Sequence, residues 1–280
     1  MNIPFFKMQG TGNDFIVINN MQLQFNRDEL SRLAQQICQR KTSVGADALM
    51  AVDQAQDGGD FRMIFFNADG TEAEMCGNGA RCIARYAYEN QLANEEMVIE
   101  TIAGKVYAKR IDQRCYEVQL NEPTNAQFSL HAEDFAGQID YVELGNPGIP
   151  HLAVHYPNLV NTPLAQIKPL AEKLRHWSIL PKGANVNFYD FLDNQSIIVR
   201  TFERGVEDFT LACGTGSGST AYLLKQLNKV DSSLVKVHVL GGELTIKLAK
   251  QELFLIGDTN IVVKGEIFDE ELDHLFANKS

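Results

Sequence analysis

Short apolar and alternating runs recur along the chain and predict an abundance of β-strands. Alternation of apolar and polar residues with period two is typical of a strand with one buried face, and a short continuous apolar run is typical of a buried strand. In the first half we expect strands at 5–8, 15–19, 43–52 (after a turn), 61–66, 97–101, 105–110 and 115–120. Only two stretches there, 27–40 and 80–89, have the spacing of a helix.

The second half repeats this plan. We expect strands at 141–144, 152–155, 183–188, 197–202, 234–240, 243–248, 252–256 and 259–267, and helices at 162–174, 219–224 and 269–276. Each half thus has many strands and one principal helix that follows a glycine-rich turn. Because strict alternation of strand and helix is absent, the pattern indicates the α+β class rather than a doubly wound parallel sheet.

A polar, turn-rich stretch at 121–134 separates the two halves. We therefore expect one domain at 1–125 and a second at 126–267. The C-terminal stretch 268–280 is expected to form a short acidic helix that packs on the first domain or caps the second.

The charge and the cysteine content limit which binding partners and which cellular compartment we expect. A net charge of −11 argues against nucleic acid and against an anionic membrane surface, because both need clustered Lys and Arg. The five cysteines form no regular framework, which indicates free thiols in a reducing compartment. We find neither a signal-peptide pattern nor an apolar run near the ~20 residues of a transmembrane helix. The expected location is the cytoplasm.

One chemical motif occurs twice, about half the chain apart. Cys76-Gly77-Asn78-Gly79 precedes the helix expected in the first half, and Cys213-Gly214-Thr215-Gly216 precedes its counterpart in the second. Each copy places a thiol at a helix N-terminus, where the helix dipole lowers the pKa of a thiol. Backbone N–H groups beside the glycines can bind a carboxylate. We expect the two thiols to face one another across a shared cleft.

Two thiols on opposite sides of an α-carbon could remove a proton from one face and return one to the other. A metal site is a poor alternative, since Cys76 and Cys82 are six residues apart with no His near them in sequence. A thiol–disulfide oxidoreductase is a further alternative, although a local Cys-X-X-Cys is absent. Dinucleotide and P-loop motifs are also absent, so we expect neither a metal nor a cofactor. Cys38, Cys82 and Cys115 suit structural roles.

Several longer motifs, in order, resemble the diaminopimelate epimerase family of pyridoxal-independent two-cysteine epimerases and racemases. They are Met8–Phe15, Phe66–Gly70, Glu74–Cys82, Gly183–Val186, Glu203–Val206 and Leu211–Gly216. The resemblance covers nearly the whole chain. It implies two similar domains, each a β-sheet curled around a central helix, with the active site between them. It leaves the oligomeric state open, with a homodimer as one candidate.

The resemblance also implies roles for individual residues. Cys76 and Cys213 would be the acid–base pair. The substrate would be bound by Asn13, Asn67, Asn185, Glu203 and Arg204 and by backbone groups of Gly77, Asn78, Gly214 and Thr215. Arg204 would pair with the carboxylate at the far end of the substrate. His151 would either tune the pKa of a thiol or have a structural role.

The turn before His151 departs from the family pattern Gly-Asn-Pro-His, in which the Asn contacts the far end of the substrate. Here the stretch is Gly145-Asn146-Pro147-Gly148-Ile149-Pro150-His151, so either Asn146 or Ile149 occupies the Asn position. We expect inversion at the α-carbon of a free amino acid, LL- to meso-diaminopimelate first. A racemase of another amino acid, such as histidine, is one alternative. A non-catalytic amino-acid-binding or redox-sensing protein, whose thiols close to a disulfide, is another.

Overall fold

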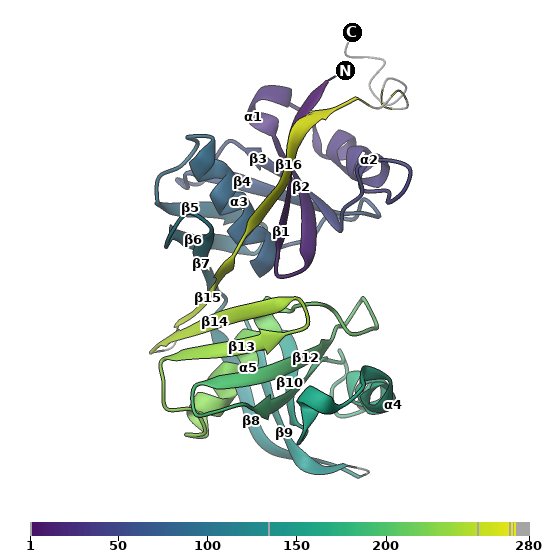
Figure 1. The fold of residues 1–280 in the computed structure, drawn as a ribbon, viewed down its shortest axis with the longest axis vertical. Coiled ribbons are helices and arrows are strands. Elements are labelled where there is room, and N and C mark those ends of the chain that lie inside the picture. The colour runs from purple at the N-terminus through teal and green to yellow at the C-terminus, as the bar shows by residue number, and fades with distance from the viewer. Residues whose placement is uncertain (1, 134, 251, 269, 271, 273–280) are drawn as a thin grey trace. The chain divides into compact units, whose positions relative to one another are not determined.

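The computed structural model describes residues 2–133, 135–250, 252–268, 270 and 272 of the chain. These residues form two compact units. In Figure 1 the first is coloured from purple to teal and includes the yellow strand Asn260–Ile267, and the second is coloured from teal to yellow-green. The first unit holds the chain up to Val118 and again from Asp258, and the second runs from Gln119 to Gly257. Both are mostly β-sheet with few helices.

The first unit is built on eight strands in the order β16-β1-β2-β3-β4-β5-β6-β7. Their bounds are β1 Ile3–Gly10, β2 Asn13–Asn19, β3 Ala48–Asp53, β4 Phe61–Asn67, β5 Glu96–Thr101, β6 Gly104–Arg110, β7 Cys115–Leu120 and β16 Asn260–Ile267. Neighbours are antiparallel except for the pairs β2–β3 and β4–β5, which are parallel.

The second unit repeats this sheet strand for strand, in the order β8-β9-β10-β11-β12-β13-β14-β15. Its strands are β8 Pro123–Ala132, β9 Phe135–Leu144, β10 Ile149–His155, β11 Asn185–Phe191, β12 Ser196–Phe202, β13 Leu234–Val239, β14 Gly242–Ala249 and β15 Glu252–Asp258. Again two pairs are parallel, β10–β11 and β12–β13, at the same places in the order. The repeat inferred from the sequence is therefore confirmed in the strand directions.

Parallel neighbours need a crossover connection, and each crossover carries helix. In the first unit α1 (Asn20–Leu23) and α2 (Arg27–Ile37) join β2 to β3, and α3 (Gly77–Glu89) joins β4 to β5. In the second unit η1 (Leu159–Asn161) and α4 (Leu164–Arg175) join β10 to β11, and α5 (Gly214–Gln226) joins β12 to β13. The helices repeat along with the strands.

The helices α3 and α5 are the central helices of the two units. All residues of α3 from Gly77 to Ala87 are buried, and α3 contacts β1, β2, β3 and β6. Helix α5 contacts β8, β9, β10, β11 and β14. A helix that is buried on every side must be enclosed. These contacts confirm the expectation of a sheet curled around a central helix in each unit.

The helices α2 and α4 cover the sheets with one apolar side each. Helix α2 begins with a capping box, in which the Asn26 side chain accepts from Glu29 N and the Glu29 carboxylate accepts from Asn26 N. It buries Leu30, Leu33, Ala34 and Ile37. Helix α4 buries Ile167, Ala171 and Leu174 in the second core. Burial of each Leu or Ile contributes about 1.5–3 kcal/mol.

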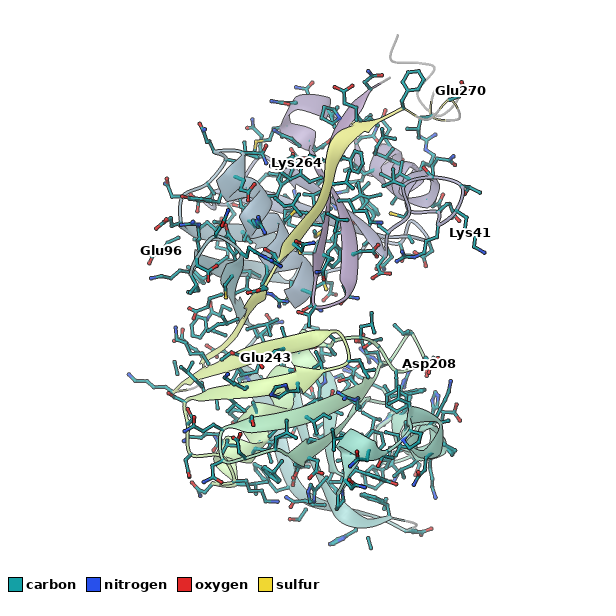
Figure 2. The ribbon with its side chains drawn as sticks, viewed as in Figure 1. Lys41, Glu96, Asp208, Glu243, Lys264 and Glu270 are labelled. Carbon is teal, nitrogen blue, oxygen red and sulfur yellow. The ribbon has the colours of Figure 1, made fainter. Side chains whose placement is uncertain are left out.

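The last strand departs from the expectation that 126–267 is one domain. β16 pairs with β1 of the first unit, from Ile3 opposite Ile267 to Gln9 opposite Asn260. Lys264, labelled in Figure 2, extends from β16 to the Glu89 carboxylate at the end of α3, 3.2 Å away. The pairing gives the outer edge of β1 a hydrogen-bonding partner, which an exposed edge strand lacks.

Two other stretches also concern the expected boundaries. The polar stretch after residue 121 was expected to be turns, but Pro123–Ala132 forms β8, paired with β9 through an irregular register. The C-terminal helix expected at 268–280 lies almost wholly outside the described residues. Leu272 is described and is buried in the core of the first unit. In the described part of the chain, no helix is both long enough and apolar enough to span a membrane.

Candidate active site

In the first unit, the strand register gathers the predicted residues at one end of the sheet. Ala48, the first residue of β3, pairs with Phe15 on one side and with Asn67 on the other. Asn13 is the first residue of β2, so Asn13 and Asn67 lie at the same end as the start of β3. The Asn67 side chain donates to the Thr71 hydroxyl at 3.0 Å.

Asn13 links the strands to the central helix. Its Oδ1 accepts a hydrogen bond from Asn78 Nδ2 at 2.6 Å, and its own Nδ2 donates to Asp47 Oδ2 at 3.3 Å. Asn78 is the second residue of α3, and Cys76 is the N-cap of that helix. The structure therefore brings Asn13, Asn78 and Cys76 to the N-terminal end of α3.

A charged network supports this end of the first unit. Arg40 Nη2 lies 2.6 Å from Asp14 Oδ1 and 2.9 Å from Asp47 Oδ1, and Lys7 Nζ lies 2.9 Å from Asp14 Oδ2. Burial opposes ionisation of Asp14, but the hydrogen bonds from Arg40 and Lys7 outweigh it and lower the pKa of the carboxyl group. Asp47 was not among the predicted site residues, yet it holds the Asn13 amide.

Among the first-unit thiols, Cys76 has the environment expected of a reactive one. It is half-buried, with extended backbone (φ −133°, ψ 121°), at the positive end of the α3 dipole. Cys82 is fully buried within α3, and burial raises the pKa of its thiol to about 12. Burial likewise raises the pKa of Cys38 to about 12. Cys82 and Cys38 are core residues.

In the second unit, Cys213 is the N-cap of α5, with φ −117° and ψ 111°. Its Sγ accepts a hydrogen bond from Gly216 N at 3.3 Å and lies 3.5 Å from the Thr215 hydroxyl. The hydrogen bond from Gly216 N favours a negatively charged sulfur, whereas in the Thr215 contact either the hydroxyl or the thiol can be the donor. Thr215 was expected to act through its backbone, and its side chain proves to contact the thiol.

Glu203 is the carboxylate next to Cys213. It accepts hydrogen bonds from the Thr210 hydroxyl at 2.5 Å and from the Cys213 thiol. Burial raises the pKa of Glu203, although both hydrogen bonds act in the opposite direction. A carboxylate in this position can take the proton of the Cys213 thiol. Thr210 is a contact that the sequence did not reveal.

The loop after β12 carries Glu203 and Arg204. Two ion pairs connect this loop to the helix α4. Lys168 pairs with Asp208, which is labelled in Figure 2 on this loop, at 3.0 Å. Arg175 pairs with Glu207 at 2.7 Å. Ion pairs at a protein surface contribute little stability each, but together these two restrict the loop.

Asn185 and Arg204 share a backbone contact. Asn185, the buried first residue of β11, accepts from Arg204 N at 2.9 Å and donates to Pro150 O at 3.3 Å. The Arg204 side chain is exposed, and its Nη1 donates to Lys182 O at 3.4 Å. In the described part of the chain no carboxylate forms an ion pair with Arg204. Its guanidinium can therefore receive a carboxylate from a ligand.

His151 lies on β10, fully buried, and pairs with Asn185 in the parallel register. Its Nδ1 is 3.3 Å from Asn187 Nδ2. Burial, with a smaller effect of the Arg204 charge, lowers the pKa of His151 to about 3. The ring is thus neutral near pH 7.

The structure of the turn before His151 bears on the choice between Asn146 and Ile149. β10 runs without interruption from Ile149 to His155 in register with β9, and Asn146 is exposed in the turn before it. Ile149 lies two residues before His151, just as Asn13 lies two before Phe15, the residue that pairs with the start of β3. This spacing favours Ile149 over Asn146 for the position of the family Asn.

The chain is similar to known proteins over nearly its whole length. Residues 5–125 and 144–262 match the family model described as diaminopimelate epimerase. The chain belongs to the diaminopimelate epimerase family. A diaminopimelate epimerase of Archaeoglobus fulgidus is 36% identical over 283 residues, which cover 97% of this chain and 99% of that protein. One of Hydrogenobaculum sp. is 38% identical over 272 residues, which cover 92% and 96%.

A solved structure supports the fold of this family member. A protein of the phenazine biosynthesis protein PhzF family from Enterococcus faecalis superposes with a TM-score of 0.71 at 16% identity, over 96% of this chain and 100% of that one. The family relationship makes the protein an enzyme, an amino-acid epimerase of the isomerase class. Within the described residues no group of three or more His, Cys, Asp or Glu side chains is arranged to hold a metal.

Proposed function

We propose that the enzyme inverts the α-carbon of a free amino acid without a cofactor, using Cys76 and Cys213 as the acid–base pair. The observation that carries this proposal is that the two cysteines hold equivalent positions in the two units. Each is the N-cap of the central helix of its unit, with closely similar backbone angles. Either sulfur lies where a helix dipole favours the thiolate.

The proposed reaction needs one thiolate and one thiol. The thiolate takes the α-proton, and the electrons of the broken C–H bond move into the α-carboxylate to form an enediolate. The thiol of the other cysteine then gives its proton to the opposite face of the carbon, so that the protonation states of the two sulfurs exchange. Backbone N–H groups of Gly77, Asn78, Gly214 and Thr215 would stabilise the charge that develops on the carboxylate.

The proposed substrate is diaminopimelate, converted from the LL to the meso form. Support comes from the names of the relatives in Archaeoglobus fulgidus and Hydrogenobaculum sp., and from Arg204, whose guanidinium suits a carboxylate at the far end of the substrate. Asn13, Asn67 and Asn185 would bind the polar groups between. Ile149 cannot donate a hydrogen bond from its side chain, and this favours testing other amino acids, histidine among them.

Deuterium exchange at the α-carbon in heavy water tests the proposal. The enzyme, kept reduced, would be incubated with LL-diaminopimelate and with a panel of amino acids that includes histidine, and label would be followed by mass spectrometry. We expect exchange and inversion with diaminopimelate. Exchange with histidine but not with diaminopimelate would show that histidine, rather than diaminopimelate, is the substrate. No exchange with any amino acid would refute the acid–base chemistry and favour a binding or redox-sensing role for the thiols.

A further inference from the structure

Behind His151 lies a buried polar chain that the proposed chemistry does not use. The side chains of Asn187, Thr201 and His151 are at most 3% exposed. Asn187 Nδ2 lies 2.8 Å from the carbonyl of Leu152 and 3.3 Å from His151 Nδ1. On its other side, Asn187 Oδ1 lies 2.9 Å from the Thr201 hydroxyl. Every polar atom of the Asn187 side chain therefore has a buried partner.

The Leu152 carbonyl fixes the orientation of this amide. A carbonyl oxygen only accepts hydrogen bonds, so the Asn187 atom that faces it must be the NH₂ group. The same NH₂ group faces His151 Nδ1, which must then accept and cannot carry a proton. The Thr201 hydroxyl donates to Asn187 Oδ1 in this orientation. The flipped amide would instead set Oδ1 against the Leu152 carbonyl, which are two acceptors with no proton between them.

The proton of the neutral imidazole is consequently on Nε2. His151 Nε2 has no hydrogen-bond partner among the described residues, and it is fully buried. A buried donor is normally satisfied. This N–H is therefore available to donate to an acceptor on a ligand, such as a carboxylate.

The same amide also abuts the helix that carries Cys213. A Cβ built on Gly216 would lie 2.1 Å from Asn187 Oδ1 and 3.1 Å from Thr201 Oγ1, so only glycine fits there. Gly216 N is the group that donates to Cys213 Sγ. Asn187 therefore packs against the residue that caps the thiol while it orients the imidazole.

We infer that Asn187 and Thr201 are positioning residues, which hold His151 as its Nε2–H tautomer and seat Gly216 against the Cys213 thiol. The expected effect of these residues on catalysis rests on the proposed function. The tautomer itself follows from the hydrogen bonds alone.

The first test is nitrogen-15 NMR of the histidine side chains of the folded enzyme near pH 7, without substrate. The His151 signals would be assigned by comparison with His151→Gln. We expect a neutral ring with the proton on Nε2. A ring protonated on Nδ1, or on both nitrogens, would overturn the inference whatever the activity of the enzyme, so that this result is separate from the proposed function.

The second test is a set of variants. Asn187→Asp supplies only acceptors, so His151 Nδ1 should gain a proton and the NMR signature should change. In the same variant we expect kcat for inversion to fall by about tenfold or more, with a smaller change in KM. Thr201→Val should reduce kcat less, and Thr201→Ser, which keeps the hydroxyl, should restore it.

The matched control is Thr220→Val. Thr220 is also buried, and its hydroxyl donates to Gly216 O at 2.8 Å. Among the described residues it forms no hydrogen bond with Asn187 or His151. It should leave the His151 signals unchanged. If Thr201→Val and Thr220→Val lower activity equally and neither Asn187→Asp nor Thr201→Val alters the ring signals, the positioning role is refuted. If Asn187→Asp fails to fold, the Thr201 variants and the wild-type spectrum still decide the question.

Discussion

Cys76 and Cys213 hold the same position in two copies of one structural plan. Each ends the loop that follows the fifth strand in the sheet order of its unit, β4 or β12, and caps the central helix. The φ and ψ angles are −133° and 121° for Cys76 and −117° and 111° for Cys213. Their surroundings differ. Cys213 has a carboxylate neighbour, Glu203, whereas at the corresponding strand end the first unit has the neutral Asn67. The two thiols are thus similar in backbone conformation but differ in the side chain that lies beside them.

Glu203→Gln should impair inversion while leaving the fold intact. Loss of a general base typically costs about 10²–10⁴-fold in rate. Burial raises the pKa of Glu203, so in the wild type kcat/KM should fall as the pH is lowered through a value above the usual carboxyl range. Measured pH profiles of the two proteins check this. If kcat/KM of Glu203→Gln falls at low pH in the same way as that of the wild type, a group other than Glu203 controls this fall.

Arg204→Ala should weaken the use of diaminopimelate far more than the use of lysine, which lacks the far carboxylate. A charge-assisted hydrogen bond contributes about 1.5–3 kcal/mol, or roughly 10–100-fold in kcat/KM. Steady-state kinetics with both amino acids gives the comparison. Lys182→Ala, which removes a nearby exposed charge, is the control and should change neither value by much. Equal losses for both amino acids in Arg204→Ala would count against the assignment.

Ile149→Asn should lower KM for diaminopimelate, because it restores a hydrogen-bonding side chain at the family Asn position. One net hydrogen bond contributes about 0.5–1.5 kcal/mol, so the expected gain is up to about tenfold. Asn146→Ala, in the exposed turn, should have no effect. A rise in KM in Asn146→Ala, with none of the expected gain in Ile149→Asn, would assign the role to Asn146 instead.

His151 should make the fold sensitive to acid. The imidazole titrates near 6.5 in the unfolded chain, and its pKa is lowered to about 3 in the fold. Between these values the unfolded chain binds more protons, so the free energy of unfolding falls as the pH is lowered, by at most about 1.4 kcal/mol per pH unit. Denaturant unfolding between pH 6.5 and 4 should show a shallower pH dependence for His151→Gln. His131→Gln, at an exposed position, should behave like the wild type.

Much of the fold was predictable because its signals are local. The repeated Cys-Gly-X-Gly motif and the paired sets of strands gave both the α+β class and the two similar domains. Long-range pairing gave no such signal. β16 joins β1 across more than 250 residues of sequence, and the polar Pro123–Ala132 forms a strand only because β9 supplies a partner.

The candidate site was predictable to a similar extent. Motifs identified Asn13, Asn185 and Glu203, and the structure places each beside the predicted partners within its own unit. The supporting contacts of Asp47, Thr210 and Asn187 depend on strand register and on a loop conformation, neither of which a single sequence specifies. Alternation along β11 gave one usable signal, since Asn187 lies two residues after Asn185 and therefore on the same face.

The central claim is that two cysteines divide the proton transfer, and stereochemically resolved deuterium exchange tests it most directly. LL-Diaminopimelate would be incubated in heavy water with the wild type, Cys76→Ala and Cys213→Ala, and both the label and the configuration at the α-carbon would be determined. We predict inverted, deuterated product from the wild type and no full inversion from either variant. Inversion at the wild-type rate by either variant would contradict the two-thiol mechanism.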